Sequence, residues 1–447
     1  MPSRSFRVIT NKKILSFNKA IKVDSDKSIS IRSLLFGAIS EDISTISNIL
    51  ESEDVASTIN CLKKLGVKIL KKKNLYFVYG KGLGSLKGKK NSSLNFGNSG
   101  TLARLLIGLL STNENINLNL TGDHSLKKRS MKKLILLMSK FGATFTPKNQ
   151  FYLPFKIISS ELPLGVNYIS GVSAQLKSAV ILGGLNSFGT TKILENERSR
   201  DHTERMLLHN KKVININNKE KKIIKINGKR SLKSLQIKVP GDPSSAAFLC
   251  ALTILKKGSS IRIKGVGLNP TRIGFYKLLK KHGGNIKFKN LKKNNNELYG
   301  DIYVKYSKLK PLKAPKKYYV SSTDEYPILF VIAALTKGVS IFNGIEDLAN
   351  KESNRILEMQ KVLSQLGIRS KASKNQMKII GRGMIDADKK KILIENLGDH
   401  RICMASFVLS ILTGARTEIK NFETVFTSSP SFLKIMKSLG AKFEIKE

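Results

Sequence analysis

Apolar and polar residues alternate along this 447-residue chain in a way that predicts two kinds of helix. The first kind is amphipathic and ends at glycine. Residues 53–65 carry two acids in the first turn and two lysines in the last, and Gly66 follows. Charges placed in this way complement the helix dipole, and glycine readily adopts the left-handed conformation that ends a helix. The same pattern, followed by a short strand, recurs before Gly142, Gly284, Gly367 and Gly440.

The interval from Gly142 to Gly284 is about twice as long as the others, so one further helix of this kind is expected inside it. Residues 205–209, followed by Asn210, fill the interval. Asparagine is the other residue that tolerates a left-handed helix cap.

The second kind of helix is almost wholly apolar after a polar start, which is typical of a helix buried on most sides. The successive starts lie 72, 73, 69, 82 and 75 residues apart, near Ser28, Gly100, Ser173, Asp242, Asp324 and Asp399. Proline after a cap residue also marks helix starts, and the pairs that fit are Asp242-Pro243, Asn269-Pro270 and Ser429-Pro430. The spacing predicts six copies of a unit with two helices and several short strands.

An apolar helix must be surrounded, so we expect three repeats to close around three buried helices. This gives two similar lobes, divided near residues 238–240, with a cleft between them. If the polar helix starts face that cleft, their dipoles together attract anions.

The formal net charge of +47 comes from 79 basic and 32 acidic residues. Such an excess fits a nucleic-acid surface, an acidic-lipid surface or a field for small anions. It is mostly lysine and is spread along the whole chain, so we attribute it chiefly to a compositional bias of the source genome. No apolar run approaches the roughly 18 residues of a membrane span. Cys61, Cys250 and Cys403 are widely spaced within predicted helices and indicate reduced core thiols of a cytosolic protein; no leader peptide is expected.

Groups suited to phosphates and carboxylates gather at the helix starts and nearby turns. Arginine binds either anion through two hydrogen bonds, and lysine acts as a compact charge that also moves protons. Any one of these clusters could be a surface salt bridge, but seven clusters at matching points of a repeat favour function. They are centred on residues 26–32, Arg104 with Arg129, 173–177, 199–202, 324–325, 351–355 and 399–401.

Asp324 and Glu352 are informative because acids are scarce here. Asp324 could be a helix cap, and Glu352 could simply favour a helix start. Together with Lys27 they could also form a set of proton donors and acceptors. The chain has no P-loop, no Rossmann glycine motif and no metal-ligand spacing.

The clusters resemble those of the 5-enolpyruvylshikimate-3-phosphate synthases, in the enolpyruvyl transferase family. The resemblance follows the right order over nearly the whole chain. It rests on Asp26-Lys27-Ser28-Ile29-Ser30, Gly97-Asn98-Ser99-Gly100-Thr101, Ser173-Ala174-Gln175, Ser199-Arg200-Asp201-His202-Thr203-Glu204-Arg205-Met206-Leu207, Val239-Pro240-Gly241-Asp242, Lys351-Glu352-Ser353 and Gly398-Asp399-His400-Arg401.

The resemblance implies an α/β (α+β) fold with two lobes, each of three βαβαββ-type repeats around buried parallel helices, an inside-out α/β barrel. Residues 20–239 would form the first lobe, and 1–19 with 240–447 the second. The implied reaction transfers the enolpyruvyl group of phosphoenolpyruvate to the 5-hydroxyl of shikimate 3-phosphate and releases phosphate. No cofactor, metal, nucleic acid or membrane is implied, and we expect a cytoplasmic monomer in the shikimate pathway to chorismate and the aromatic amino acids.

The resemblance also implies roles for individual residues. Asp324 would accept the proton of the attacking hydroxyl, and Lys27 and Glu352 would exchange protons at the enol carbon. Shikimate 3-phosphate would bind Lys27, Ser28, Arg32, Ser173, Ala174, Gln175, Ser199, Arg200, Asp324 and Lys351. Phosphoenolpyruvate would bind Lys27, Gly100, Arg129, Gln175, Arg355 and Arg401. In this family the position of Gly100 bears on inhibition by glyphosate, which occupies the phosphoenolpyruvate site and is longer than the substrate.

Three residues depart from the family pattern. Ser130 replaces a usual proline, Asn354 a usual aspartate and Ser429 a usual aromatic residue. The first is expected to loosen the local backbone, and none removes a charged ligand.

Two alternative functions fit parts of the sequence. The sister transferase acting on UDP-N-acetylglucosamine typically carries a cysteine in a glycine-rich loop, and no cysteine here lies in such a loop. A nucleic-acid-binding protein would fit the charge, but aromatic residues make up only 7% of the chain, tryptophan is absent and no RNA-binding motif is visible.

Overall fold

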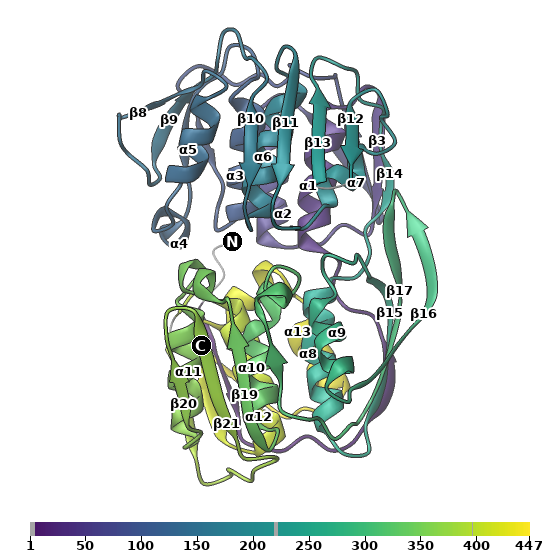
Figure 1. Cartoon of the computed structure of the whole chain (residues 1–447), viewed down its shortest axis with the longest axis vertical. Coiled ribbons are helices and arrows are strands. Elements are labelled where there is room, and N and C mark those ends of the chain that lie inside the picture. Colours follow the sequence, from purple (N-terminus) through teal and green to yellow (C-terminus); the bar gives the residue numbers. More distant parts are fainter. Residues whose placement is uncertain (1–4, 219–221, 396) are drawn as a thin grey trace. The chain divides into compact units, whose positions relative to one another are not determined.

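The computed structural model describes residues 5–218, 222–395 and 397–447. The chain divides into two compact units, and each has its own apolar core. The N-terminal unit comprises Ser25–Val239 and Lys293–Glu297, and the C-terminal unit comprises Met1–Asp24, Pro240–Lys292 and Leu298–Glu447. Figure 1 shows the helices and strands of both units.

The N-terminal unit contains three four-stranded sheets of one design. In each sheet the first two strands pair parallel, and the remaining neighbours pair antiparallel. The strand orders are β14 (Gln236–Lys238), β3 (Ile43–Ser47), β5 (Leu75–Tyr79), β4 (Lys68–Lys72); β6 (Ser93–Asn95), β7 (Asn117–Thr121), β9 (Phe155–Ile158), β8 (Thr144–Thr146); and β10 (Asn167–Ser170), β11 (Thr190–Glu195), β13 (Lys222–Asn227), β12 (Ile214–Asn217).

Three nearly apolar helices lie inside this unit, and α6 packs on β11 and β13 (Figure 1). They are α1 (Lys27–Ile39), α3 (Gly100–Leu110) and α6 (Ala174–Leu185). The other helices are α2 (Glu53–Lys64), α4 (His124–Lys127), α5 (Lys132–Ser139) and α7 (His202–Leu207).

The C-terminal unit repeats the same design. With the parallel pair again written first, its sheets are β2 (Asn18–Ile21), β15 (Ser260–Gly267), β17 (Glu297–Lys305), β16 (Asn285–Asn294); β18 (Lys313–Ala314), β19 (Gly338–Asn343), β21 (Gln376–Gly381), β20 (Ser370–Ala372); and β22 (Lys391–Ile394), β23 (Arg416–Ile419), β1 (Arg7–Thr10), β24 (Glu444–Lys446). The buried helices are α8 (Pro243–Leu255), α10 (Tyr326–Ala334) and α12 (His400–Thr413), which pack on one another. The others are α9 (Gly274–Lys281), α11 (Arg355–Gln365), α13 (Phe432–Ser438) and the short 3₁₀ helices η1 (Lys316–Tyr318), η2 (Thr323–Glu325), η3 (Glu346–Asn350) and η4 (Phe422–Thr427).

These six sheets and six buried helices confirm the repeat and the fold class predicted from the sequence. Polar side chains accept the backbone N–H bonds at five of the six buried helix starts. The caps are Asp26, Ser99, Ser173, Asp242 and Asp399, with N–H to oxygen distances of 2.8, 3.3, 3.4, 2.7 and 3.0 Å. α10 differs, because η2 precedes it and its cap residue Glu325 makes no side-chain cap bond.

Details of four helix ends differ from the prediction. α7 ends at Leu207, and Asn210 is not in the left-handed region; its N–H instead donates to the Leu207 carbonyl at 2.7 Å. After α9 the left-handed residue is Gly283, not Gly284. The prolines after Asn269 and Ser429 do not start helices, since α9 begins at Gly274 and α13 at Phe432.

The closest approach of α3 to α6 depends on a glycine. A Cβ added at Gly108 would lie 2.6 Å from the Ala179 carbonyl oxygen and 2.8 Å from its Cα. Both atoms are backbone, so neither can move without shifting a helix. We expect Gly108→Ala to lower the free energy of unfolding by about 1–3 kcal/mol, as for other overpacked cores.

Urea unfolding measures this change. Gly171→Ala is the matched control, because a Cβ there meets nothing within 4 Å and its φ is not positive. Equal stability of the two variants, or stabilisation of Gly108→Ala by alanine's helix propensity, would contradict the packing argument.

Candidate active site

In the N-terminal unit, the start of α1 carries a paired lysine and a buried arginine. Lys27 Nζ lies 2.9 Å from an Asp54 carboxylate oxygen at the start of α2. Arg32, one turn on, donates to Ser28 Oγ at 2.6 Å and to Thr203 Oγ1 of α7 at 2.9 Å. These contacts fix the first turn of α1 to α2 and α7.

The start of α3 lies beside two guanidinium groups. Arg104 Nη1 donates to the Gly100 carbonyl at 3.0 Å and to Gln175 Oε1 at 3.1 Å. Arg129 Nη2 donates to Asn98 Oδ1 at 2.6 Å. A Cβ at Gly100 would lie 2.7 Å from Arg104 Nη1 and 3.2 Å from Arg129 Nη1. The predicted residues Gly100, Arg129 and Gln175 are therefore brought together.

Ser173 caps α6, so Ala174 and Gln175 form its first turn. The Gln175 amide nitrogen donates to Thr101 Oγ1 at 3.0 Å, which joins the starts of α6 and α3. Arg104 was not among the predicted ligands, although it contacts two of them.

Ser199 is fully buried between β11 and α7. Its backbone N–H and its hydroxyl both donate to Glu195 Oε1, at 2.9 and 3.0 Å. Arg200, the next residue, is partly exposed.

A buried cluster of two lysines and two glutamates supports Ser199, and sequence reasoning missed it. Lys177 of α6 is 0% exposed and pairs with Glu195 and, at 2.7 Å, with Glu204. Lys222 of β13 lies 2.7 Å from the second Glu195 oxygen. Burial opposes the charge of Lys177, but the carboxylates of Glu204 and Glu195 outweigh it and raise the pKa of Lys177. Burial likewise works against the Glu195 charge, and Lys177 with Lys222 still lowers the pKa of Glu195.

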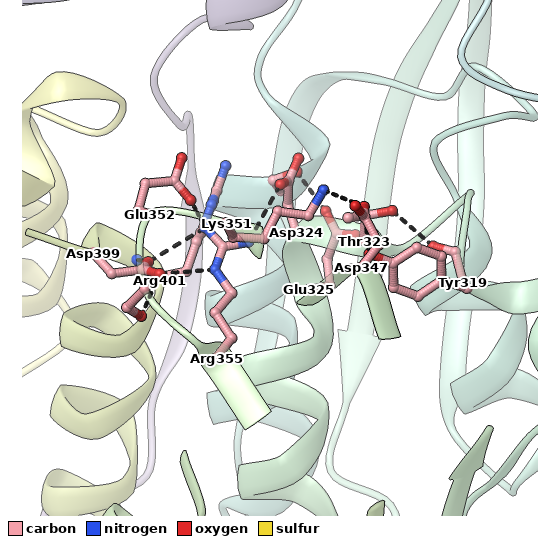
Figure 2. A network of polar contacts seen from close by, with 12 residues as sticks. Tyr319, Thr323, Asp324, Glu325, Asp347, Lys351, Glu352, Arg355, Asp399 and Arg401 are labelled. Atoms are coloured by element: carbon pink, nitrogen blue, oxygen red, sulfur yellow. Dashed lines mark hydrogen bonds and ion pairs between the residues drawn. The ribbon is translucent and has the colours of Figure 1, made fainter. Parts of the chain in front are cut away.

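In the C-terminal unit, Arg355 at the start of α11 is the centre of a carboxylate network (Figure 2). Its side chain is 1% exposed. Its guanidinium donates to Asp399 at 2.9 Å and to Glu352 at 2.6 Å, and lies 3.6 Å from an Asp324 oxygen. Burial opposes the charge, yet Asp399, Glu352 and Asp324 together raise the pKa of Arg355. Asp324 and Glu352, the two acids considered informative in the sequence, thus both lie against the Arg355 guanidinium.

Lys351 lies beside this network (Figure 2). Its Nζ is 2.6 Å from an Asp347 oxygen, which also accepts the Tyr319 hydroxyl at 2.9 Å. Burial, and then the Asp347 charge, raises the pKa of Tyr319, so the phenol stays a donor. Asp347 and Tyr319 were not predicted; Asp347 holds Lys351, and Tyr319 holds Asp347.

Arg401 at the start of α12 differs from Arg355 in its contacts. It is 4% exposed, and its guanidinium lies 5.9 Å from the centre of the Phe248 ring. Within the described residues, its Nε and Nη1 atoms are buried without a hydrogen-bond acceptor. A buried arginine in this state favours an anionic ligand.

Each of the three departures makes a hydrogen bond. Ser130 Oγ accepts from the Lys132 N–H at 3.3 Å before α5, and Asn354 caps α11 by accepting from the Leu357 N–H at 3.3 Å. Ser429 Oγ donates to Asp24 at 2.9 Å. The loosening expected at Ser130 stays a prediction.

The three cysteines are buried and unpaired on α2, α8 and α12, as expected. Burial raises the pKa of the Cys61 thiol to about 12. In the described part of the chain, no three His, Cys, Asp or Glu side chains are grouped so that they could hold a metal ion. None of the described helices is long and apolar enough to cross a membrane.

A family model described as EPSP synthase (3-phosphoshikimate 1-carboxyvinyltransferase) matches residues 12–436. The chain belongs to the EPSP synthase family. It is 36% identical to the 3-phosphoshikimate 1-carboxyvinyltransferase of Zymomonas mobilis over 443 residues, 98% of this chain and 97% of the relative. The Ruthia magnifica enzyme of the same name is 37% identical over 431 residues, 96% of this chain and 97% of the relative.

Solved structures agree with this membership. The EPSP synthase of Acinetobacter baumannii superposes with a TM-score of 0.85 at 32% identity, covering 99% of this chain and 100% of that one. The enolpyruvyl transferase NikO of Streptomyces tendae gives a TM-score of 0.76 at 15% identity, with 99% of each chain covered, which shows a shared fold only. The matches do not favour the UDP-N-acetylglucosamine transferase.

Proposed function

We propose that this member of the EPSP synthase family transfers the enolpyruvyl group of phosphoenolpyruvate to the 5-hydroxyl of shikimate 3-phosphate, with release of phosphate. The observation that carries the proposal is the meeting of Asp324 and Glu352 at the buried Arg355. Two carboxylates held by one fixed cation supply acid–base groups next to a site for an anion. The names of the relatives give the same reaction.

Each substrate is assigned a set of groups, and the assignment rests on the family motifs. Phosphoenolpyruvate is proposed to bind Lys27, Gly100, Arg129, Gln175, Arg355 and Arg401. Among the described residues, the buried Nε and Nη1 atoms of Arg401 have no hydrogen-bond acceptor, which supports its part in this set. Shikimate 3-phosphate is proposed to bind Lys27, Ser28, Arg32, Ser173, Ala174, Gln175, Ser199, Arg200, Asp324 and Lys351.

The reaction needs one proton transfer from the attacking hydroxyl and two at the methylene carbon, one onto it and one off it, and three residues are assigned to them. Asp324, 25% exposed, accepts the proton of the attacking hydroxyl. Lys27 and Glu352 exchange protons at the methylene carbon of phosphoenolpyruvate. The tetrahedral intermediate keeps a phosphate and a carboxylate on one carbon, so preorganised cations stabilise it. The proposed chemistry uses no cofactor or metal.

The two compact units correspond, in this proposal, to the two predicted lobes. We also propose that the protein acts as a monomer in the cytoplasm and binds no nucleic acid, its partners being the two small substrates.

A phosphate-release assay tests the function. We expect release only when shikimate 3-phosphate and phosphoenolpyruvate are both present. Release with UDP-N-acetylglucosamine in place of shikimate 3-phosphate, or none with the proposed pair, would overturn the proposal.

A further inference from the structure

We propose that Glu195 and Lys177 are positioning residues of the shikimate 3-phosphate site: Lys177 fixes Glu195, and Glu195 fixes the segment Ser199–Arg200. The inference rests on the proposed function of that segment. Neither residue is proposed to contact a substrate; both act through Ser199.

The segment after β11 has no regular structure before α7, so side-chain contacts must hold it. Glu195, the last residue of β11, accepts both donors of Ser199 through one oxygen, Oε1. The backbone of Ser199 therefore cannot move without breaking two hydrogen bonds to a charged acceptor. Arg200 is covalently attached to this fixed point, which limits where its guanidinium can reach.

The charge cluster then ties this segment to the other elements of the same site. Lys177 lies on α6, two residues after Gln175, and bonds to carboxylates on β11 and α7. α7 in turn carries Thr203, which accepts from Arg32 of α1 at 2.9 Å. One buried lysine thus connects α6, which carries Ala174 and Gln175, with β11 and α7, the two elements that flank the segment Ser199–Arg200.

Stability alone does not account for these charges. Replacing a buried ion pair by apolar residues of similar size is often neutral or stabilising, whereas removing one partner leaves a costly charge. Lys177 stands among buried residues on an otherwise nearly apolar helix, where a Met or Leu would pack without desolvation cost. What an apolar residue cannot do is orient the Glu195 carboxylate toward Ser199.

The test begins with Lys177→Met, which keeps the side chain's length and removes its charge. We expect the KM for shikimate 3-phosphate to rise about fivefold, the effect of weakening one or two buried hydrogen bonds. The KM for phosphoenolpyruvate and kcat should change less than twofold. Lys225→Met, at an exposed lysine of β13, is the matched control and should leave all three unchanged.

Two further readouts separate positioning from general damage. In Lys177→Met/Glu204→Gln the Glu204 charge no longer competes for Lys222, so Lys222 can hold the Glu195 carboxylate in place of Lys177, and most of the lost affinity should return. Without Lys177, the pKa of Glu195 should rise, so the KM for shikimate 3-phosphate should increase further as the pH falls from 8 to 6. A purely structural role predicts neither the recovery nor the new pH dependence.

Hydrogen exchange at the Ser199 amide, measured without ligands, should be faster in Lys177→Met and in Glu195→Gln. This arm does not depend on the reaction: absence of turnover by the wild type would refute the proposed function alone. Unchanged exchange, equal effects on both KM values, or no recovery in the double variant would overturn the positioning role. If Lys177→Met does not fold, Glu195→Gln, which leaves Lys177 paired with Glu204, replaces it in the kinetic comparison.

Discussion

Asp324→Asn is expected to slow turnover about a hundredfold or more, as for loss of a general base. Asparagine keeps the size and hydrogen-bonding shape of aspartate but cannot accept the hydroxyl proton. The loss should appear in kcat, with little change in the KM for phosphoenolpyruvate.

The fold should survive this substitution. The contact between Asp324 and Arg355 is 3.6 Å, the longest of the three carboxylate contacts, and Asp399 and Glu352 remain at 2.9 and 2.6 Å. The alternative that Asp324 is only a helix cap finds no support, since α10 begins after Glu325 and has no side-chain cap bond. A true cap would also survive as asparagine.

Steady-state kinetics and urea unfolding of the same preparations test this prediction. Asp386→Asn is the matched control, because it makes the same change in an exposed ion pair with Lys13. Near-normal turnover in Asp324→Asn, or a loss explained by unfolding, would remove Asp324 from the chemistry.

The fold was predictable because apolar segments recur along the sequence at a nearly regular spacing. Six apolar runs with polar starts give the six buried helices almost to the residue, as in α3 beginning at Gly100. The errors fall at local ends. Proline after Asn269 suggests a helix start, but Asn269 Oδ1 accepts the Thr271 N–H at 2.9 Å and forms a turn instead.

In the candidate site, only the residues that lie within the family motifs could be predicted from the sequence. Asp54 holds Lys27 from another helix, a tertiary contact that no spacing reveals. Glu195 and Asp347 lie four residues before Ser199 and Lys351, but outside a regular helix this spacing does not predict a bond. One signal was available: Lys177 is a charge followed by the apolar run of α6, and a lysine there requires a carboxylate partner. The identity of that partner follows only from the packing of β11 and α7 on α6.

Gly100→Ala is expected to raise the KM for phosphoenolpyruvate about tenfold, which corresponds to 1.4 kcal/mol. The reason is that the added methyl displaces two arginine side chains beside Gly100. The new methyl would lie 2.7 Å from Arg104 Nη1 and 3.2 Å from Arg129 Nη1, so both guanidinium groups must shift. They are the ends of flexible side chains, so the shift should cost ligand contacts more than folding stability.

The turn itself does not require glycine at this position. Gly97 has a φ of +58°, but Gly100 is not in the left-handed region. Alanine is also the better helix former at the start of α3. A higher KM for phosphoenolpyruvate without loss of stability would therefore show that the methyl acts by displacing the guanidinium groups. A drop in stability would show instead that the turn requires glycine.

A double-mutant cycle with Arg104→Met tests the displacement directly. If the methyl acts by moving Arg104, its effect on the KM should be smaller in the Arg104→Met background, so the two changes should not add. Full additivity would show that the methyl acts elsewhere.

Glyphosate gives the second measurement in the same variants. We expect the wild type to be inhibited competitively with phosphoenolpyruvate, because Gly100 leaves room for the longer inhibitor. In Gly100→Ala the methyl should meet that inhibitor directly, in addition to displacing the arginines that both ligands use. The inhibition constant should therefore rise more than the KM, by about tenfold for each 1.4 kcal/mol of difference. A constant ratio of the two would mean that the methyl acts only through the arginines, and that Gly100 does not contact the ligand.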